Sequence, residues 1–347
     1  MIKARCQKYI LEFKQASGTS RGVLRTKETY FIHLSEDGKE GIGECGLFRG
    51  LSVDDTPNYE SKLQWVCEHI HIGKEELLSA LCAYPSIQFG IEQAFLSLES
   101  HNSFELFDTS FVHEKTPIEI NGLIWMGEID FMERQIEEKL AQGFKTIKLK
   151  IGALDFEKEC ALLSGIRERF TADEIELRVD ANGAFAPQVA LSKLERLAKF
   201  ELHSIEQPIR QGQVAAMNQL CKQTPLPIAL DEELIGLFDK ASKRKLLEEI
   251  QPQYIILKPS LIGGIQGSME WIELAEEYDI SWWITSALES NIGLNAIAQW
   301  TSTLQTTMPQ GLGTGGLFVN NLMAPLELKN GALYYDKQKP WDISNLF

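Results

Sequence analysis

Lysines and carboxylates recur at regular intervals through the second half of this 347-residue chain. Each one closes a short apolar run, and successive positions lie 25 to 30 residues apart: Lys148 with Lys150, Asp180, Glu206, Asp231 and Lys258. A strand, a helix and two loops need roughly 25–30 residues. The spacing therefore predicts that these side chains stand at the carboxyl ends of successive parallel strands. A (β/α) barrel builds its active site at that end.

The alternation within each strand predicts which side chains point into the barrel. Ile147 and Leu149 share one strand face and must meet the surrounding helices, so Lys148 and Lys150 point inward. The same parity places Lys258 inside. A purely structural barrel fills these positions with branched aliphatic residues, and buried charge is costly unless it is paired or bound to a metal. The inward charges therefore indicate a chemical site.

Three carboxylates on neighbouring strand ends predict a metal site. Asp180, Glu206 and Asp231 would repel one another unless a cation lay between them. Hard oxygen ligands without histidine or cysteine suit Mg²⁺, with Mn²⁺ as a substitute. The alternative is that each carboxylate forms a structural ion pair with a neighbouring lysine or arginine. Three carboxylates at matching strand ends, flanked by lysines, favour the metal.

The lysines of such a site have a chemical role of their own. A neighbouring positive charge and burial lower the pKa of a lysine, and the neutral amine can then remove a proton from a carbon next to a carboxylate. A metal ion would stabilise the resulting enediolate as a Lewis acid. The competing interpretation, a Schiff-base lysine as in barrel aldolases, leaves the three carboxylates unexplained.

The rest of the chain predicts the elements that position these groups. Residues 116–318 alternate strand-like and helix-like segments, which is typical of an α/β fold of the (β/α)7β TIM-barrel type. Residues 1–115 carry strand alternation followed by helical spacing, so we expect an α+β capping domain. Residues 319–347 have an irregular, hairpin-like sequence pattern, and we expect them to pack back on that domain.

Composition excludes several classes of protein. The net charge is −15, from 34 basic and 49 acidic residues, which argues against a broad nucleic-acid surface. No segment has the length and apolarity of a membrane span or a signal peptide. The six cysteines are scattered, which indicates reduced thiols in a cytoplasmic protein. The expected partner is therefore a small molecule, and the oligomeric state stays open.

Several motifs, in order along nearly the whole chain, resemble the enolase superfamily in its muconate-lactonising-enzyme-like subgroup. The set as a whole is highly specific, whereas each motif alone is weak. The motifs are GIGECG (41–46), PSIQFGIEQAFLSL (85–98), KLKIG (148–152), RVDANG (178–183), IEQPI (205–209), LDEE (230–233) and ILKPSLIGG (256–264).

Within that subgroup, three further motifs resemble the o-succinylbenzoate synthases: INGLIWMG (120–127), SALESNIG (286–293) and QGLGTGGLF (310–318). The resemblance implies Mg²⁺-dependent syn-dehydration of 2-succinyl-6-hydroxy-2,4-cyclohexadiene-1-carboxylate to 2-succinylbenzoate, a step of menaquinone synthesis. The alternatives are an N-acylamino acid racemase, a dipeptide epimerase, or a catalytically silent binding barrel. Dipeptide epimerases usually carry Asp-x-Asp where this chain has Gly313, Thr314 and Gly315.

The resemblance also implies roles for single residues. Lys150 would be the base and, once protonated, would help the hydroxide leave from the same face. Lys258 would stabilise the anionic intermediate from the opposite side, and Lys148 would support the substrate carboxylate. The implied Mg²⁺ ligands are Asp180, Glu206 and Asp231.

Candidate substrate-binding residues carry two interpretations each. Ser286 and Ser290 either contact substrate or cap the following helix. Gly263 either allows close backbone approach to an anion or makes a turn. Arg21 or Arg49, in the first domain, either meets the succinyl carboxylate or is solvated at the surface.

Overall fold

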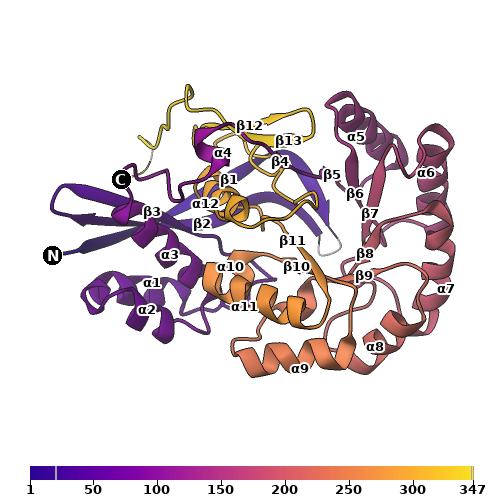
Figure 1. The fold of residues 1–347 in the computed structure, drawn as a ribbon, viewed down its shortest axis with the longest axis horizontal. Helices are drawn as coiled ribbons and strands as arrows, with labels where there is room; N and C mark the ends of the chain where they lie inside the picture. Colours follow the sequence, from indigo (N-terminus) through magenta and orange to yellow (C-terminus); the bar gives the residue numbers. More distant parts are fainter. Residues whose placement is uncertain (20–21, 345, 347) are drawn as a thin grey trace.

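The computed structural model describes residues 1–19, 22–344 and 346. An antiparallel three-stranded sheet with its helices lies beside a barrel of parallel strands (Figure 1). The elements of the first part are β1 (Lys3–Thr19), β2 (Gly22–Glu36), β3 (Lys39–Cys45), α1 (Tyr59–Glu68), the 3₁₀ helix η1 (Ile70–Ile72), α2 (Lys74–Ala80), α3 (Pro85–Glu99) and α4 (Ser110–His113).

In the capping sheet a tight turn joins β2 to β3, and helix α3 packs closely against β3. Asp37 and Gly38 have positive φ values of 49° and 83° between β2 and β3, as tight β-hairpin turns favour. Helix α3 lies so close to β3 that a Cβ on Gly43 would stand 1.9 Å from the carbonyl oxygen of Gly90. The glycines of GIGECG therefore permit sheet and helix to touch through their backbones.

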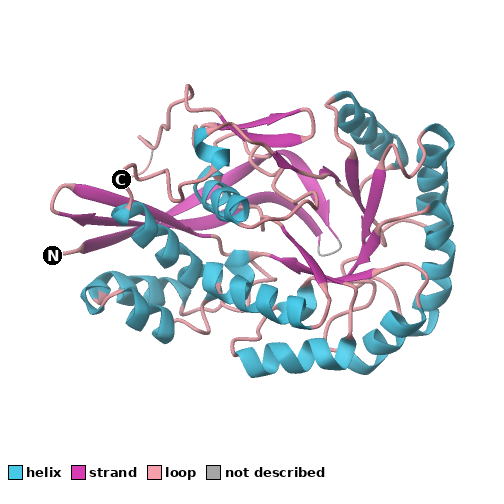
Figure 2. Cartoon of the chain, in the orientation of Figure 1, coloured by secondary structure: helices cyan, strands magenta, loops and turns pink. Residues whose placement is uncertain are grey.

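The barrel sheet has seven hydrogen-bonded strands in the order β11-β10-β9-β8-β7-β6-β5 among the described residues. Helices surround it on the outside (Figure 2). The strands are β5 (Gly122–Ile124), β6 (Thr146–Lys150), β7 (Glu176–Asp180), β8 (Ser204–Glu206), β9 (Ile228–Leu230), β10 (Tyr254–Leu257) and β11 (Ser281–Ile284). The helices are α5 (Ile129–Ala141), α6 (Phe156–Arg169), α7 (Pro187–Leu197), η2 (Ala198–Phe200), α8 (Val214–Gln223), η3 (Glu232–Leu234), α9 (Lys240–Ile250), α10 (Pro259–Ile262), α11 (Gly264–Glu277) and α12 (Asn291–Thr303).

A short segment after α12 closes the ring. Gln310 forms a parallel bridge with Ile120, and Gly311 forms one with Thr285 at the end of β11. This segment, within residues 308–318, therefore lies between the first and last strands of the barrel. Together these elements make the (β/α)7β-type architecture expected from the alternation.

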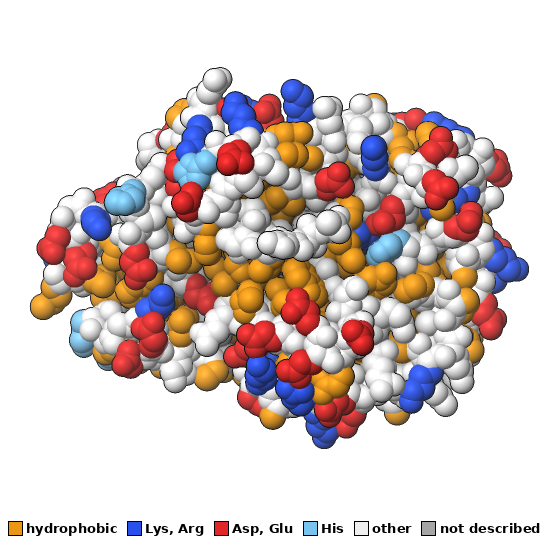
Figure 3. All heavy atoms as spheres, viewed as in Figure 1, with side chains coloured by type: hydrophobic (Ala, Val, Ile, Leu, Met, Phe, Trp, Pro, Cys, Tyr) orange, Lys and Arg blue, Asp and Glu red, His pale blue; other side chains and the backbone are white. Residues whose placement is uncertain are grey.

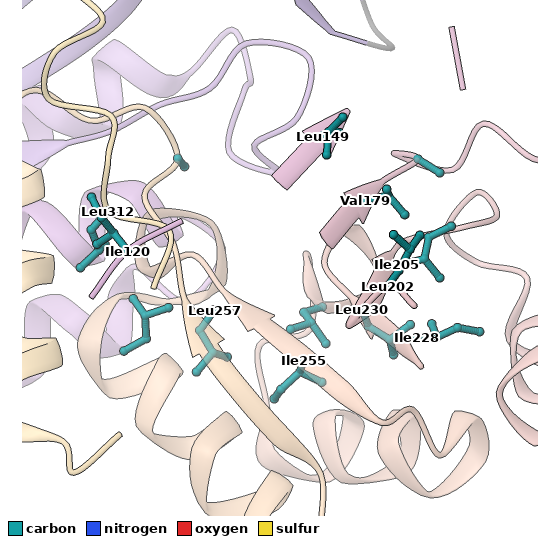
Figure 4. Packing of buried hydrophobic residues seen from close by; sticks show 14 of the residues in the cluster. Ile120, Leu149, Val179, Leu202, Ile205, Ile228, Leu230, Ile255, Leu257 and Leu312 are labelled. Carbon is teal, nitrogen blue, oxygen red and sulfur yellow. The ribbon is translucent and has the colours of Figure 1, made fainter. Parts of the chain in front are cut away.

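Strand parity is as predicted. Leu149, Val179, Ile205 and Leu257 are buried in the large cluster between strands and helices (Figure 4). On the opposite face of β10, Ile256 packs inside the barrel with other apolar residues. The period-2 pattern of each strand thus separates an apolar outer face from the inward face that carries the charges.

The C-terminal segment contacts both parts of the chain. The hairpin of β12 (Leu326–Lys329) and β13 (Ala332–Tyr335) pairs with β4 (Ile118–Glu119), beside the start of the barrel. Asn320 bonds to backbone and side chain of β1, and Leu322 and Leu346 pack on the capping sheet. The division at residues 115/116 and 318/319 remains our proposal for the domain boundaries.

The described helices include none with the length and apolarity needed to cross a membrane. On the face in Figure 3, charged side chains of both signs are interspersed, and hydrophobic side chains gather across the middle.

Candidate active site

The strand register brings the charged residues together at one end of the barrel. Lys150 lies opposite Asp180 on the neighbouring strand, and Asp180 lies opposite Glu206 on the next. Asp231 follows β9 as the N-cap of η3, and Lys258 follows β10 as the N-cap of α10. The regular spacing in the sequence therefore becomes a single cluster.

Each carboxylate of the cluster pairs with lysine. Lys148 Nζ donates to Glu206 Oε2 and lies 3.3 Å from Asp180 Oδ2. Lys150 Nζ donates to Asp180 Oδ2 at 2.9 Å, and Lys258 Nζ donates to Asp231 Oδ2. The carboxylates therefore form ion pairs with lysines, as the alternative to a metal site predicts. The lysine ammonium groups lie between the carboxylates.

Burial and neighbouring charges shift the pKa values within this cluster. Burial acts to lower the pKa of Lys148, but the Glu206 and Asp180 carboxylates outweigh it and raise that pKa. Lys258 behaves in the same way, because Asp231 and Glu206 raise its pKa despite its burial. The expected lowering is therefore wrong for these two lysines while they pair with carboxylates. Burial and the Asp180 charge raise the pKa of Glu206.

Two residues that the sequence analysis left without a role complete the cluster. Lys150 Nζ donates to Asn182 Oδ1 at 2.7 Å, and Asn182 Nδ2 donates to Glu232 Oε1 at 3.0 Å. Asn182 has a positive φ of 42°, in the left-handed region that asparagine adopts more readily than most residues. Asn182 lies in the RVDANG motif and Glu232 in the LDEE motif, each close in sequence to a candidate metal ligand. This closeness could have indicated from the sequence that both belong to the site.

Glu233, the last residue of the LDEE motif, forms hydrogen bonds that connect two loops. Its carboxylate accepts from Gln207 Nε2 at 3.1 Å and from Gly212 N at 2.8 Å. Glu233 therefore joins the loop after β9 to the loop after β8.

A cavity of about 110 Å³ opens onto the cluster. Lys148, Lys150, Asp180 and Lys258 line it, together with Asn182. Apolar residues from both domains form its other walls: Phe48, Leu51, Leu123, Trp125, Leu288 and Leu317. The cavity therefore offers a polar end with lysines and an apolar end shared with the capping domain, as small-molecule sites do.

Of the predicted substrate-binding residues that the structure describes, Ser286 lines the cavity, whereas Ser290 and Gly263 have structural roles. Ser286 lines the cavity, and its Oγ donates to Glu289 and accepts from Thr314. Ser290 takes the capping alternative, since it is fully buried and its Oγ accepts from Ile292 N. Gly263 makes the turn between α10 and α11, with a φ of 99°, and faces Gln88 outside the barrel. Arg21 lies outside the described residues.

Comparison with known proteins identifies the family to which this chain belongs. Residues 131–338 match the family model described as enolase C-terminal domain-like, and residues 1–98 match the MenC N-terminal domain. The o-succinylbenzoate synthase of Desulfotalea psychrophila is 48% identical over 93% of this chain and 96% of that protein. The chain belongs to the o-succinylbenzoate synthase family of the enolase superfamily.

Solved structures of the superfamily agree with the fold. The crystal structure of MenC from Desulfotalea psychrophila superposes with a TM-score of 0.86 at 44% identity, covering 96% of this chain and 99% of that one. Muconate lactonizing enzyme from Pseudomonas fluorescens, complexed with muconolactone, shares the fold with a TM-score of 0.85 at 21% identity, covering 99% and 98%.

The carboxylates have the chemistry of ligands for a hard divalent cation. Asp180, Glu206 and Asp231 are 1–2% exposed and offer only oxygen atoms. Glu206 Oε1 is buried without a hydrogen bond and has Lys258 Nζ at 3.8 Å. With the lysines between them, no three such groups among residues 1–19, 22–344 and 346 surround one point as metal ligands. The chemistry of the donor set fits a hard divalent cation, and these three carboxylates are the residues that would hold it.

Proposed function

We propose that this chain is an o-succinylbenzoate synthase, which dehydrates 2-succinyl-6-hydroxy-2,4-cyclohexadiene-1-carboxylate to 2-succinylbenzoate in menaquinone synthesis. The observation that carries the proposal is the 48% identity with a protein of that name over nearly the full length of both chains. The lysine pair on the cavity wall supports it, because the reaction needs a base beside the acidic carbon.

The proton transfers are assigned to Lys150. Its neutral amine would remove the proton α to the ring carboxylate, and its ammonium would then return a proton to the departing hydroxyl on the same face. One C–H bond and one C–O bond break, a ring double bond forms, and water leaves. Asn182 holds Nζ at 2.7 Å, which fixes the direction of the amine.

The other two lysines are assigned electrostatic roles. Lys258 lies across the cavity from β6, after β10, and would face the developing anion from the opposite side. Lys148 would support the ring carboxylate. Bound by Asp180, Glu206 and Asp231, Mg²⁺ would supply Lewis-acid stabilisation of negative charge developing on that carboxylate.

The direct test is turnover of the cyclohexadiene by purified protein with Mg²⁺, followed by the ultraviolet absorbance of the aromatic product. EDTA should stop the reaction and added Mg²⁺ or Mn²⁺ should restore it. A well-folded protein that leaves the substrate unchanged under these conditions contradicts the proposal.

A second candidate is racemisation of N-acylamino acids, since Lys150 and Lys258 line the same cavity from two sides. Dipeptide epimerisation is less well supported, because Gly313 lines the cavity where those epimerases carry the first aspartate of Asp-x-Asp. Solvent deuterium incorporated at the α-carbon of an N-succinylamino acid would support racemisation. A silent binding barrel would show no activity that the change Lys150→Ala removes.

We further propose that the enzyme works in the cytoplasm. All six cysteines are free thiols, as a reducing compartment favours.

A further inference from the structure

A buried lysine of the capping domain has no hydrogen-bond partner. Lys27, on β2, is 6% exposed, and its Nζ is buried without a hydrogen bond to any described residue. Burying an ammonium group without a partner is costly, so such a group is retained only where something compensates for it.

The two carboxylates whose charges act on Lys27, Glu289 and Glu44, already accept hydrogen bonds from other residues. Burial lowers the pKa of Lys27, while the charges of Glu289 and Glu44 act to raise it. The two oxygens of Glu289 accept from Ser260 and Ser286. Those of Glu44 accept from Thr29, Ser290 and Gly293. These carboxylates compensate for the Lys27 charge at a distance and leave its three N–H donors unused.

Lys27 lies next to the active-site cavity. It lines a second cavity of about 250 Å³ together with Leu24, Thr26 and Glu28. Phe48 and Leu288 line both this cavity and the active-site cavity. These two apolar side chains are therefore the partition between Lys27 and the catalytic lysines.

The other basic side chain that lines the second cavity, Arg49, is already paired with carboxylates. Arg49 donates to Glu28 at 2.5 and 3.0 Å and to Asp55 at 2.6 Å. This pairing argues against the earlier suggestion that Arg49 meets the succinyl carboxylate.

The active-site cavity is small, which suggests that a bound ligand also uses the second cavity. Its volume of about 110 Å³ lies well below the roughly 300–1,000 Å³ of ordinary ligand sites. The two cavities together reach the lower end of that range. The proposed substrate also carries two carboxylates, one on the ring and one at the end of the succinyl chain. The roles proposed above give a partner, Lys148, to the ring carboxylate alone.

We propose that Lys27 binds the terminal carboxylate of the succinyl chain, with the chain passing between Phe48 and Leu288 into the second cavity. This inference rests on the proposed function and adds a specificity-determining residue to it. Lys27 Nζ donates to the carboxylate oxygens, while the ring remains beside Lys150.

The test compares two product-like ligands on purified full-length protein with Mg²⁺. 2-Succinylbenzoate carries the terminal carboxylate, and 2-butanoylbenzoate replaces it with a methyl group. Calorimetry should show that the wild type prefers 2-succinylbenzoate and that Lys27→Met reduces this preference about 10- to 100-fold, as expected for a charge-assisted hydrogen bond. Arg49→Met removes one positive charge from the same cavity and should leave the preference unchanged.

Two results would overturn the inference. One is a wild type without the preference. The other is a Lys27→Met protein that keeps it, including one that binds both ligands equally more weakly, since Lys27 would then be only a counterion for Glu44 and Glu289. If Lys27→Met does not fold, Lys27→Arg and Lys27→Gln separate the charge from the fold, since only Arg should keep the preference. Failure of the proposed function is seen separately, as absence of turnover by the wild type.

Discussion

Glu44 of the capping sheet accepts two hydrogen bonds from Ser290 at the start of α12. Ser290 N lies 2.9 Å from Glu44 Oε1, and Ser290 Oγ lies 2.6 Å from Glu44 Oε2. Gly293 N adds a third bond at 2.9 Å. A fully buried carboxylate of the first domain thus caps a barrel helix, where the helix dipole favours negative charge.

Removing this cap should loosen the contact between the domains. Glu44→Ala leaves the buried N–H groups of Ser290 and Gly293 without an acceptor, which we expect to lower the free energy of unfolding by about 3 kcal/mol. Urea unfolding followed by circular dichroism measures the change. Glu40→Ala, an exposed carboxylate on the same strand, should change it by less than about 0.5 kcal/mol. Equal effects of the two substitutions would refute the capping role.

Lys150→Ala should reduce kcat at least about 10³-fold, because the reaction loses its base and its proton donor together. Single-turnover measurements with the cyclohexadiene substrate would give the rate. Lys145→Ala removes an exposed lysine just before the same strand and should keep wild-type kcat. Wild-type turnover by Lys150→Ala would assign the base elsewhere.

Glu206→Gln should weaken Mg²⁺ binding about 100-fold or more, beyond the 10- to 100-fold typical of losing a partner of a metal ligand. Isothermal titration of metal-stripped protein with MgCl₂ reads this without relying on activity. Glu176→Gln, at the first residue of β7, where Glu176 accepts from Arg178, should bind Mg²⁺ as the wild type does. If both variants bind alike, the carboxylates serve as ion-pair partners for the lysines.

Asp54 should make stability fall as the pH rises toward neutrality. Burial raises its pKa to about 6, and its Oδ1 is buried without a hydrogen bond. Between roughly pH 4 and 6 the folded state holds a proton that the unfolded state has lost, so the stabilisation present at low pH disappears through this window. Asp54→Asn should therefore gain about 2 kcal/mol over the wild type between pH 4.5 and 7.5.

Asp55 provides the matched control for this titration. Although burial opposes it, the Gly50 N–H and Arg49 lower the pKa of Asp55, so its charge stabilises the fold above pH 4. Asp55→Asn should lose similar stability at pH 4.5 and 7.5 in the same urea series. A constant difference between Asp54→Asn and wild type across that range would show that Asp54 is ionised throughout.

Gly43→Ala should destabilise the capping sheet by about 3 kcal/mol or more, because its Cβ would meet backbone atoms of α3 that cannot move independently. Thermal unfolding measures the loss. Gly165→Ala, on α6 with open space around its Cβ, should be neutral or stabilising by up to about 1 kcal/mol. A Gly43→Ala protein with unchanged melting temperature would mean that the sheet and helix can separate at little cost.

Local patterns predicted much of this protein. The period-2 alternation around Lys148 and Lys150 assigned both side chains to the barrel interior, and they line the cavity. The helical spacing expected within residues 1–115 is present in α3, where Ile87, Ile91 and Phe95 pack in one apolar cluster with the sheet. These predictions succeed because a strand or helix presents its faces according to its own sequence.

Contacts between distant segments could not be predicted in this way. The sequence leaves Ser290 open between substrate contact and capping, whereas the fold brings Glu44, 246 residues earlier, within hydrogen-bond distance of it. Lys27 had no marked pattern, since its importance comes from Phe48 and Leu288 lying between it and the catalytic lysines.

The sequence by itself determined the barrel, the inward charges and their order around the ring, because strand period and unit length are local properties. The tertiary structure decided which charges pair, which serine faces the cavity and which basic residue of the capping domain lacks a partner. Those outcomes depend on distances between side chains from separate elements, and packing in three dimensions sets them.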